Sequence, residues 1–466
     1  GATDQSTAIF EEIKDDDILV HHPYHSFEDT VQRFLETAAS DPDVLAIKVA
    51  IYRTASDSKV IQSLIEAAEN GKEVAVMVEL KARFDEQNNL EWVSRLEEKG
   101  IHVAYGSLGL KTHTKTAIVV RKEADEVRTY SHIGTGNYNS NTAKGYEDLG
   151  MFTADRDIGQ DLVKLFNFFT GPTLDEEFHK LLVAPVTMRE RFTDLIRREA
   201  ATAEAGGDGR IIAKVNGLED PDIVAELYRA GLAGVEIDLI VRDICRLRPG
   251  VEGLSDNITV HSVVGRFLEH SRIYYFGNDD ESEWYIGSAD WMTRNLDNRV
   301  EAVTPVTDDH LRGKLEFILE TILSDNRRRW VLQGDGSYIQ MRPSENEQIR
   351  DTQSLLMEQA YRTATQDGMS QTDTERFMIE YGPGRAGHII DMRPATDDAG
   401  TRWAFRSGLS GSKLCSRGDR RKHDTRVPFS EFKDNHDIEG PLFDGEAPDA
   451  VCSYCWSNID KTSNNQ

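Results

Sequence analysis

Hydrophobic residues alternate along the first part of the chain between strand-like and helix-like spacing. Residues 44–52 form a continuous apolar run rich in β-branched side chains, which predicts a buried strand. Residues 60–70 have helical spacing and end at Gly71, a residue typical of helix C-termini. Residues 74–80 and 101–105 predict further strands, with a helix between them. This order predicts a mainly parallel sheet with helices on its faces.

The same order of segments returns after residue 210, which predicts a second α/β unit. A hairpin, then a helical link over residues 174–200, separates it from the first unit. The predicted fold class is thus α/β, with two tandem domains and an irregular C-terminal tail. The predicted boundaries are a disordered leader at 1–16, domains at 17–180 and 181–345, and a poorly ordered tail at 346–466, of which 346–364 can form a helix.

The net charge of −27 and the pI near 4.9 argue against a nucleic acid or another polyanion as a surface ligand. The motifs described below are nevertheless rich in Arg, Lys and His, so we expect an acidic surface around a basic pocket. A surplus of acid this large also fits a salt-loving organism. With no apolar run of membrane-spanning length and no charged-then-apolar leader, the chain is expected to be cytoplasmic.

The four cysteines are too few for a disulfide framework. Cys245 follows a predicted strand and is expected to be a small core residue. The Cys-x-x-Cys sequence at residues 452–455 is half of a zinc site. It needs Cys415, His423 or His436 to complete it, so a metal site there stays open.

Two histidines recur in matching frames. His113 is followed two residues later by Lys115, and His270 is followed two residues later by Arg272. In a strand such neighbours face the same side. A neutral imidazole can attack phosphorus, and the adjacent cation attracts phosphate oxygens. One such pair alone is most simply a surface histidine; the repeat instead favours two half-sites around one phosphoryl group.

A tight turn follows each histidine motif, at residues 134–137 (GTGN) and 287–290 (GSAD). Backbone N–H groups and hydroxyls in such turns suit an oxyanion. Asn137 or Asp290 is expected to orient a histidine through its second ring nitrogen, and Asn137 to contact phosphate. Ordinary turn chemistry is the plainer alternative for either turn alone.

Arginines lie just past the predicted strands, where parallel α/β sheets bind ligands. Arg53 and Arg83 follow two strands of the first unit, and Arg242 ends the equivalent strand of the second. Arg246 lies twelve residues after Gly234, as Arg83 does after its own glycine, and is a candidate phosphate ligand. Guanidinium groups bind phosphate oxygens in pairs, although surface salt bridges are the alternative.

Residues 17–345 resemble the catalytic half of type 1 polyphosphate kinase, within the phospholipase D-like superfamily. The resemblance rests on stretches that together cover about two-thirds of the chain: HHPYHSFEDTV, LAIKVAIYRTASDS, VELKARFDE, GLKTHTK, HIGTGNYN, EGLSDN, RFLEHSRIYYF and GSADWMTRNLDNRVE. It implies two phospholipase D-like domains related by a pseudo-two-fold axis. It also implies reversible transfer of a phosphate from ATP to polyphosphate, with Mg²⁺.

The resemblance also implies individual roles. His113 takes the position of the phosphohistidine nucleophile, and His270 that of the second essential histidine, which contacts nucleotide phosphates. Tyr146 and Arg242 match positions that contact ATP in the family. Arg53 and Arg83 match its magnesium and phosphate region. A guanidinium cannot ligate a cation, so we interpret the last two as phosphate clamps beside the metal.

The family has two further domains before this segment, one of which contacts adenine. A fragment, a split gene product and a natural short form are all compatible with this difference, as is a separate N-terminal partner chain. A homo-oligomer is expected. Two other functions stay open: a phospholipase D-like phosphodiesterase or nuclease using the same histidines, and a non-catalytic polyphosphate-binding fragment.

Overall fold

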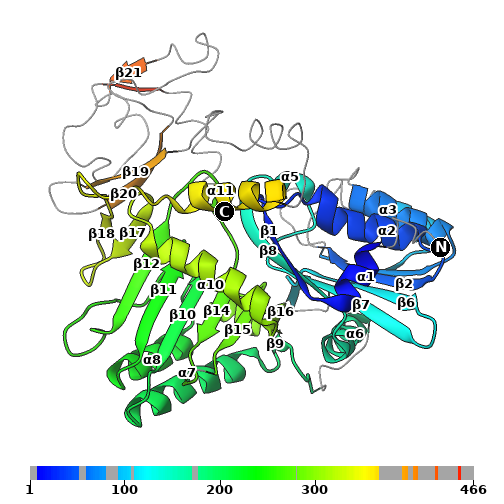
Figure 1. Ribbon diagram of the computed structural model, residues 1–466, viewed down its shortest axis with the longest axis horizontal. Helices are drawn as coiled ribbons and strands as arrows, with labels where there is room; N and C mark the ends of the chain where they lie inside the picture. Colours follow the sequence, from blue (N-terminus) through cyan, green and yellow to red (C-terminus); the bar gives the residue numbers. More distant parts are fainter. Residues whose placement is uncertain are drawn as a thin grey trace. The chain divides into compact units, whose positions relative to one another are not determined.

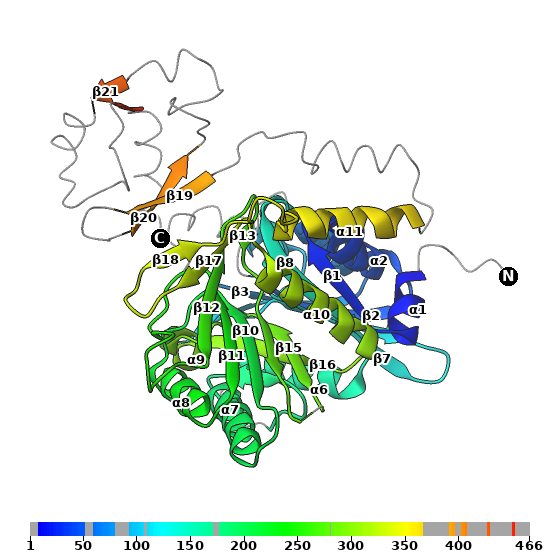
Figure 2. The same ribbon diagram turned by 60° about the vertical axis from the view of Figure 1, so that its left-hand side comes forward.

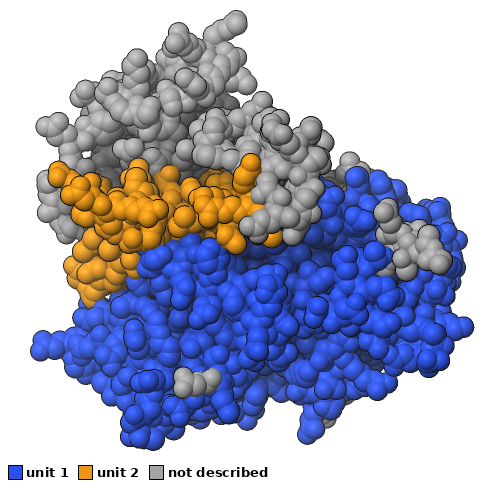
Figure 3. Space-filling view, in the orientation of Figure 1, with its two compact units in different colours: residues 1–262, 268–324 blue, residues 263–267, 325–466 orange. Residues whose placement is uncertain are grey.

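The computed structural model describes residues 8–51, 59–79, 93–106, 110–170, 177–279 and 281–366, and the backbone of four short strands between 391 and 452. The chain divides into two compact units, residues 1–262 with 268–324, and residues 263–267 with 325–466 (Figure 3). Both copies of the histidine motif lie in the first unit. In the described ranges, no helix combines the length and apolar character that crossing a bilayer requires.

The first half of unit 1 is built on a mixed sheet (Figure 1). Its strand order is β1 (Ile18–His22), β8 (Tyr146–Thr153), β7 (Val127–Gly134), β6 (Thr116–Lys122), β2 (Val44–Ile51), β3 (Glu73–Val78) and β4 (His102–Tyr105). Among these strands only β2–β3 and β3–β4 pair in parallel. The prediction of a mainly parallel sheet is therefore wrong here. Short connections join β6, β7 and β8, and a short connection can only link antiparallel neighbours.

Helices accompany this sheet: α1 (Ala8–Asp15), the π-helical turn η1 (Glu28–Gln32), α2 (Arg33–Ser40), α3 (Lys59–Glu69), α5 (Ser140–Ala143) and α6 (Arg156–Thr170). Ser26 lies just before η1, and its Oγ accepts a hydrogen bond from the Asp29 N–H at 3.1 Å. After α3 the chain turns at Gly71, whose φ of 82° favours glycine.

The disordered leader predicted up to residue 16 is wrong for residues 8–15, which form α1. Phe10 and Ile13 lie on one helical face and are buried. The Phe10 ring centroid lies 5.8 Å from that of Phe34 and 4.9 Å from that of Tyr130. Packing against this core, rather than the intrinsic preference of a short polar segment, accounts for the helix.

The second half of unit 1 repeats the plan. Its sheet runs β12 (Ile258–Val263), β11 (Glu236–Val241), β10 (Arg210–Val215), β14 (Ile273–Phe276), β15 (Glu283–Gly287) and β16 (Arg299–Val306), with β9 (Leu182–Ala184) also on β16. Its helices are α7 (Met188–Glu204), α8 (Pro221–Leu232), α9 (Thr293–Asp297) and α10 (Asp309–Ser324), with α7 and α8 side by side against β10 and β11 (Figure 2). The helix predicted over 174–200 is wrong where β9 forms.

The two halves exchange short strands. β5 (Lys111–Thr112), from the first half, pairs in parallel with β16 of the second. β13 (Leu268–Glu269), from the second half, pairs in parallel with β8 of the first. Because the exchange is reciprocal, it agrees with the expected pseudo-two-fold relation between the two halves.

Unit 2 contains β17 (Arg329–Leu332) paired with β18 (Tyr338–Gln340), followed by α11 (Thr352–Gln366). α11 confirms the helix expected as possible over residues 346–364, at the start of the segment predicted as a poorly ordered tail. Thr352 donates to the buried Asp325 carboxylate through both its N–H and its hydroxyl at 2.7 Å, and Leu356 and Met357 are buried. Further on lie β19 (Asp391–Thr396) with β20 (Arg402–Ser407), and β21 (Arg426–Pro428) with β22 (Ala450–Cys452).

The possible zinc site around residues 452–455 stays a prediction, because Cys415, His423, His436 and Cys455 lie outside the described residues. Cys245 is only half-buried, and its Sγ donates to the Leu247 carbonyl at 3.4 Å.

Candidate active site

The strand exchange places each histidine against the opposite half. His113 follows β5, and its N–H donates to the Val300 carbonyl at 2.9 Å. His270 follows β13, and its N–H donates to the Glu147 carbonyl at 3.2 Å. Residues 113–115 lie between β5 and β6, so the expectation that strand alternation aligns this histidine and lysine is wrong.

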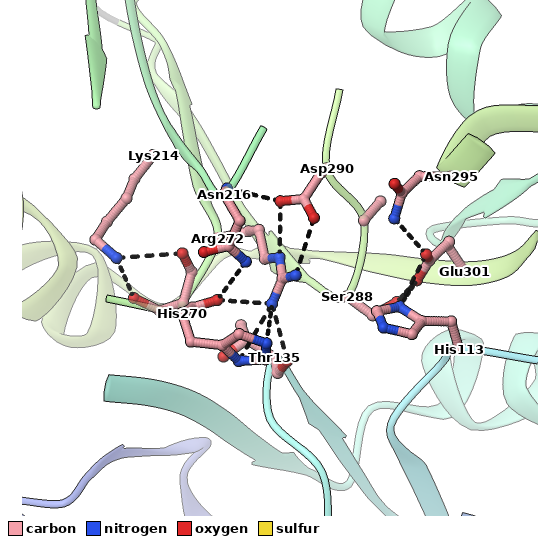
Figure 4. Close-up of polar contacts among 12 residues, drawn as sticks. His113, Thr135, Lys214, Asn216, His270, Arg272, Ser288, Asp290, Asn295 and Glu301 are labelled. Atoms are coloured by element: carbon pink, nitrogen blue, oxygen red, sulfur yellow. Dashed lines mark hydrogen bonds and ion pairs between the residues drawn. The ribbon is translucent and has the colours of Figure 1, made fainter. Parts of the chain in front are cut away.

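A buried glutamate holds the His113 ring. His113 Nδ1 lies 2.9 Å from the carboxylate of Glu301, which is fully buried. Glu301 also accepts hydrogen bonds from the Ser288 hydroxyl and from Asn295 Nδ2, the latter at 2.7 Å (Figure 4). When Glu301 is ionised it only accepts, so in that state the His113 proton lies on Nδ1 and the lone pair of Nε2 is available for attack.

His270 has an equivalent partner. Its Nδ1 lies 2.7 Å from Asp148 Oδ1, which also accepts from the Thr135 hydroxyl at 2.6 Å. In both halves the hydroxyl residue precedes the carboxylate by 13 residues. Each histidine is thus oriented by a carboxylate from the other half of the unit, and the two arrangements correspond.

The orienting groups differ from those expected. Asp290 does not orient a histidine: it accepts from Arg272 Nε at 3.1 Å and Nη2 at 3.0 Å, and from the Asn216 N–H at 2.7 Å. Asn137 Oδ1 is buried and accepts no hydrogen bond from the described residues. The true partners lie on β8 and β16, to which the sequence analysis assigns no element. A recurring acid 13 residues after each turn hydroxyl is the signal that marks them.

The cations of the two motifs also correspond. Lys115 Nζ donates to the His113 carbonyl, and Arg272 Nη1 donates to the His270 carbonyl at 2.6 Å. Arg272 Nη1 also lies 3.3 Å from the Thr135 carbonyl, which belongs to the first half. Both cations are almost completely buried. They therefore place positive charge beside the histidines while fixing the backbone around them.

One charge acts on both imidazoles. Burial, followed by the charges of Lys115, Arg299 and Arg272, holds the pKa of His113 well below its usual 6.5. Burial also lowers the pKa of His270; its carboxylate partner opposes this shift and Arg272 adds to it. Since Arg272 lowers the pKa of both histidines, the two rings share one electrostatic site.

The two orienting carboxylates differ in their electrostatics. Burial raises the pKa of Glu301 to about 7, and burial lowers that of Lys115 to about 7. Burial also raises the pKa of Asp148, but the neighbouring His270, the Thr135 hydroxyl and Arg272 lower it overall. Equivalent positions thus hold one carboxylate that protonates readily and one that stays ionised.

Comparison with known proteins decides the family. Residues 8–175 match Polyphosphate kinase C-terminal domain 1, and residues 181–353 match Polyphosphate kinase C-terminal domain 2. The polyphosphate kinase of Synechocystis sp. is 57% identical over 359 residues, and that of Parasynechococcus marenigrum is 56% identical over 352. The chain belongs to the polyphosphate kinase family. These matches cover 77% and 76% of this chain, which spans only 49% of the length of either relative.

Solved structures support the fold. The crystal structure of polyphosphate kinase from Porphyromonas gingivalis is 40% identical, with a TM-score of 0.71 over 77% of this chain and 54% of that one. The phosphatidylserine synthase of Haemophilus influenzae, 9% identical, matches 80% of this chain and 100% of that one with a TM-score of 0.50, a likeness of fold alone. The expected α/β class with two tandem domains is confirmed.

Two predicted nucleotide contacts of this family member lie beside His270. The Tyr146 ring centroid is 5.3 Å from that of His270. Arg242 is half-buried, and its pKa is lowered by burial and then by Arg272. Its Nε is buried and donates to no group among the described residues. Arg242 thus has an N–H donor available for a ligand. The N–H groups of Arg272, by contrast, mostly donate to groups within the protein.

Arg299 is a site residue that the sequence analysis missed. It begins β16, two residues before Glu301, and its charge lowers the pKa of His113, Lys115 and Glu301. It therefore faces the His113 side of the site, as Arg242 faces the His270 side. The stretch NLDNRVE contains it, but a lone arginine before a buried acid gives no distinctive spacing.

The structure does not place the three other arginines predicted to bind phosphate beside the described histidines. Arg246 pairs with Glu219 at 3.1 Å, and 60% of its side chain is exposed. Arg53 and Arg83 lie outside the described residues. Their proposed phosphate contacts stay predictions.

The described site does not offer a Mg²⁺ ligand set. Mg²⁺ usually takes one or two free carboxylates together with substrate phosphates. Asp148 and Glu301 are committed to histidines and Asp290 to Arg272. Within the described ranges, no three His, Cys, Asp or Glu side chains converge on a possible metal position.

Proposed function

We propose that this chain carries the phosphoryl-transfer centre of a polyphosphate kinase: it moves the γ-phosphate of ATP to inorganic polyphosphate, reversibly, through a phosphohistidine at His113. The reciprocal pairing of His113 with Glu301 and of His270 with Asp148 carries this proposal. It supplies a nucleophile of fixed tautomer and a second imidazole in the same charged site.

In the first step, His113 Nε2 attacks the γ-phosphorus while the bond from that phosphorus to the bridging oxygen breaks. ADP leaves with the electron pair, and the positive charge formed on the imidazole is neutralised through Nδ1–H by Glu301. In the second step a terminal oxygen of polyphosphate attacks the phosphorus. The N–P bond breaks, the imidazole is restored, and the chain is one phosphate longer.

The electrostatic difference between the carboxylates supports this division of roles. The low pKa of Asp148 keeps a negative charge against His270, which favours a proton on that ring once an anionic phosphate enters. His270 can then donate to the leaving oxygen. His113, with its depressed pKa, stays neutral and nucleophilic.

Cations on both sides neutralise the transferring group. Lys115 and Arg272 supply buried charge, and Arg242 and Arg299 supply guanidinium groups toward the ligand. Tyr146 is proposed to contact ATP from beside His270, and Asn137 to contact phosphate through its amide NH₂ group, which is its hydrogen-bond donor.

Incubation with γ-labelled ATP tests the proposal. We expect an acid-labile, base-stable label on the protein that is absent from His113→Ala and is discharged by polyphosphate or ADP. Cleavage of a phosphodiester without a label would favour a phosphodiesterase. Polyphosphate binding with neither reaction would favour a non-catalytic fragment.

Several finer properties belong to the same proposal. Activity is expected to depend on Mg²⁺, which titration with EDTA and Mg²⁺ tests. A homo-oligomer or an N-terminal partner chain is expected, which light scattering and pull-down test, and the location is expected to be cytoplasmic. We also infer adaptation to high salt from the net charge of −27. Dilution from molar salt to about 0.1 M should then lower the melting temperature, because screening of surface repulsion is lost.

A further inference from the structure

A second buried charged cluster lies behind His270 on the strand bridge that carries it. In the β8–β13 register, Glu147 is opposite Glu269. Each immediately precedes an active-site residue, Asp148 and His270. Because successive side chains point to opposite faces of a strand, the glutamates occupy one face of the bridge and the catalytic pair the other.

The two glutamates carry one proton between them. Both are buried and lie opposite each other in the register, and burial raises the pKa of Glu147. Two neighbouring carboxyl groups in a buried site do not both ionise, so one of them holds a proton. Lys214, also buried, pairs with Glu269 at 3.0 Å and donates to the Ser271 hydroxyl at 2.9 Å. One carboxyl, one carboxylate and one ammonium leave the cluster neutral.

The remaining groups around the cluster fit this charge state. The Tyr24 hydroxyl donates to Glu147 Oε1. His21 Nε2 lies 3.7 Å from Glu147 Oε2, and burial lowers the pKa of His21 to about 3, so that ring is neutral. Asp148 is the other charged group that acts on Glu147.

The backbone pairing of this bridge is short, because β13 has only two residues. Hydrogen bonds from the Leu268 N–H to the Gly145 carbonyl at 2.9 Å and from the His270 N–H to the Glu147 carbonyl at 3.2 Å flank it. At the equivalent positions around His113, the register pairs Thr112 with Val300. The charged cluster is therefore particular to the His270 side.

We propose that Glu147, Glu269 and Lys214 are positioning residues: they clamp β13 onto β8 and thereby set the hydrogen bond between His270 and Asp148. The inference rests on the proposed function, since its main readout is phosphoryl transfer. A shift of the bridge would misalign His270 while leaving His113 and its partner in place.

Three variants of the full chain test the clamp. Glu147→Ala removes it, Glu147→Gln replaces the carboxyl proton with an amide donor, and Glu199→Gln is the matched control. Glu199 is equally buried, but it accepts from the N–H groups of Arg210 and Asn278 away from the site. Each is assayed for kcat and KM for ATP between pH 6 and 10, with melting temperature recorded alongside.

We expect Glu147→Ala to lower kcat about 10- to 100-fold, with little change in KM. Loss of a residue that orients a metal ligand has an effect of this size in metalloenzymes. Glu147→Gln should restore most of kcat, because its amide can donate where the protonated carboxyl does. Glu199→Gln should keep kcat even where its melting temperature falls.

A folded Glu147→Gln variant whose kcat is more than about 10-fold below that of the unmodified protein would overturn the clamp, and this holds even if Glu147→Ala does not fold. So would a folded Glu147→Ala variant with unchanged kcat. Absence of any transfer or label in the unmodified protein would instead contradict the proposed function.

Discussion

Replacing Glu301 with glutamine should disable the nucleophile through its tautomer. In the structure Asn295 Nδ2 donates to Glu301 Oε1 at 2.7 Å, which selects an oxygen at that position. The NH₂ group of a glutamine would then occupy the position of Oε2, facing the Ser288 hydroxyl and His113 Nδ1, which lies 2.9 Å from both carboxylate oxygens. An amide N–H donated to Nδ1 requires a lone pair there, so in the molecules that form this bond the proton moves to Nε2 and blocks attack; in the others a neutral amide oxygen replaces the charged acceptor.

The size of the effect follows from the bond that is lost. A hydrogen bond to a charged group contributes about 1.5–3 kcal/mol, which corresponds to roughly 10- to 150-fold in rate. Reversal of the tautomer adds to this, and a comparable carboxylate-to-amide change beside a catalytic histidine costs about 10⁴-fold. We therefore expect Glu301→Gln to slow formation of phosphohistidine at least ~10-fold and at most ~10⁴-fold.

The assay is single-turnover labelling by γ-labelled ATP, combined with ¹⁵N NMR of histidine-labelled protein to identify which nitrogen of His113 is protonated. Ser288→Ala is the comparison: it removes one neutral donor to the same carboxylate, and should cost only about 2- to 10-fold. If Glu301→Gln labels within threefold of the unmodified protein, or if His113 keeps its proton on Nδ1, the proposed tautomer control is wrong.

Three further predictions concern space, charge and pH. Gly136→Ala should lower transfer activity, because the added Cβ would lie 2.4 Å from the Asp148 carboxylate. Gly313→Ala is the control: this glycine lies in a helix with open space around the added Cβ. It should leave activity unchanged and raise the free energy of unfolding by up to about 1 kcal/mol. Arg299→Ala should weaken single-turnover ATP binding, and Arg299→Lys should restore it poorly because lysine lacks the guanidinium fork; equal binding by all three proteins would exclude a phosphate contact. Burial lowers the pKa of His21 and His132, two histidines with buried side chains, from 6.5 to about 3. Above pH 6.5 both rings are neutral in the folded and unfolded chain, but between pH 6.5 and 3 the unfolded chain binds protons that the folded chain does not. The free energy of unfolding should therefore fall by up to about 1.4 kcal/mol per pH unit for each as the pH is lowered; a flat profile in urea titrations would contradict this.

The sequence indicated the repeat because its elements are local. A histidine, a cation two residues later and a glycine-rich turn recur in a fixed frame, and β2, α3, β3 and β4 lie within a few residues of their predicted bounds. The predictions failed where local pattern carried little information. Packing around Phe10 orders a segment whose composition predicts a disordered leader.

The strands β8 and β16 show why the orienting carboxylates could not be found in this way. Both are almost wholly buried, yet they contain Asp148 and Glu301, so neither shows the apolar run or the alternation that predicts a strand. Their acids are tolerated because they are hydrogen-bonded to histidines from the opposite half.

The sequence by itself determined the two half-sites and the residue types that phosphoryl chemistry needs. Only the tertiary structure decided how they combine, because His113 and Glu301 are 188 residues apart, and His270 and Asp148 are 122 apart. No local spacing encodes such a contact. It arises when β5 and β13 cross to the opposite sheets, which places each imidazole against a charge from the other half.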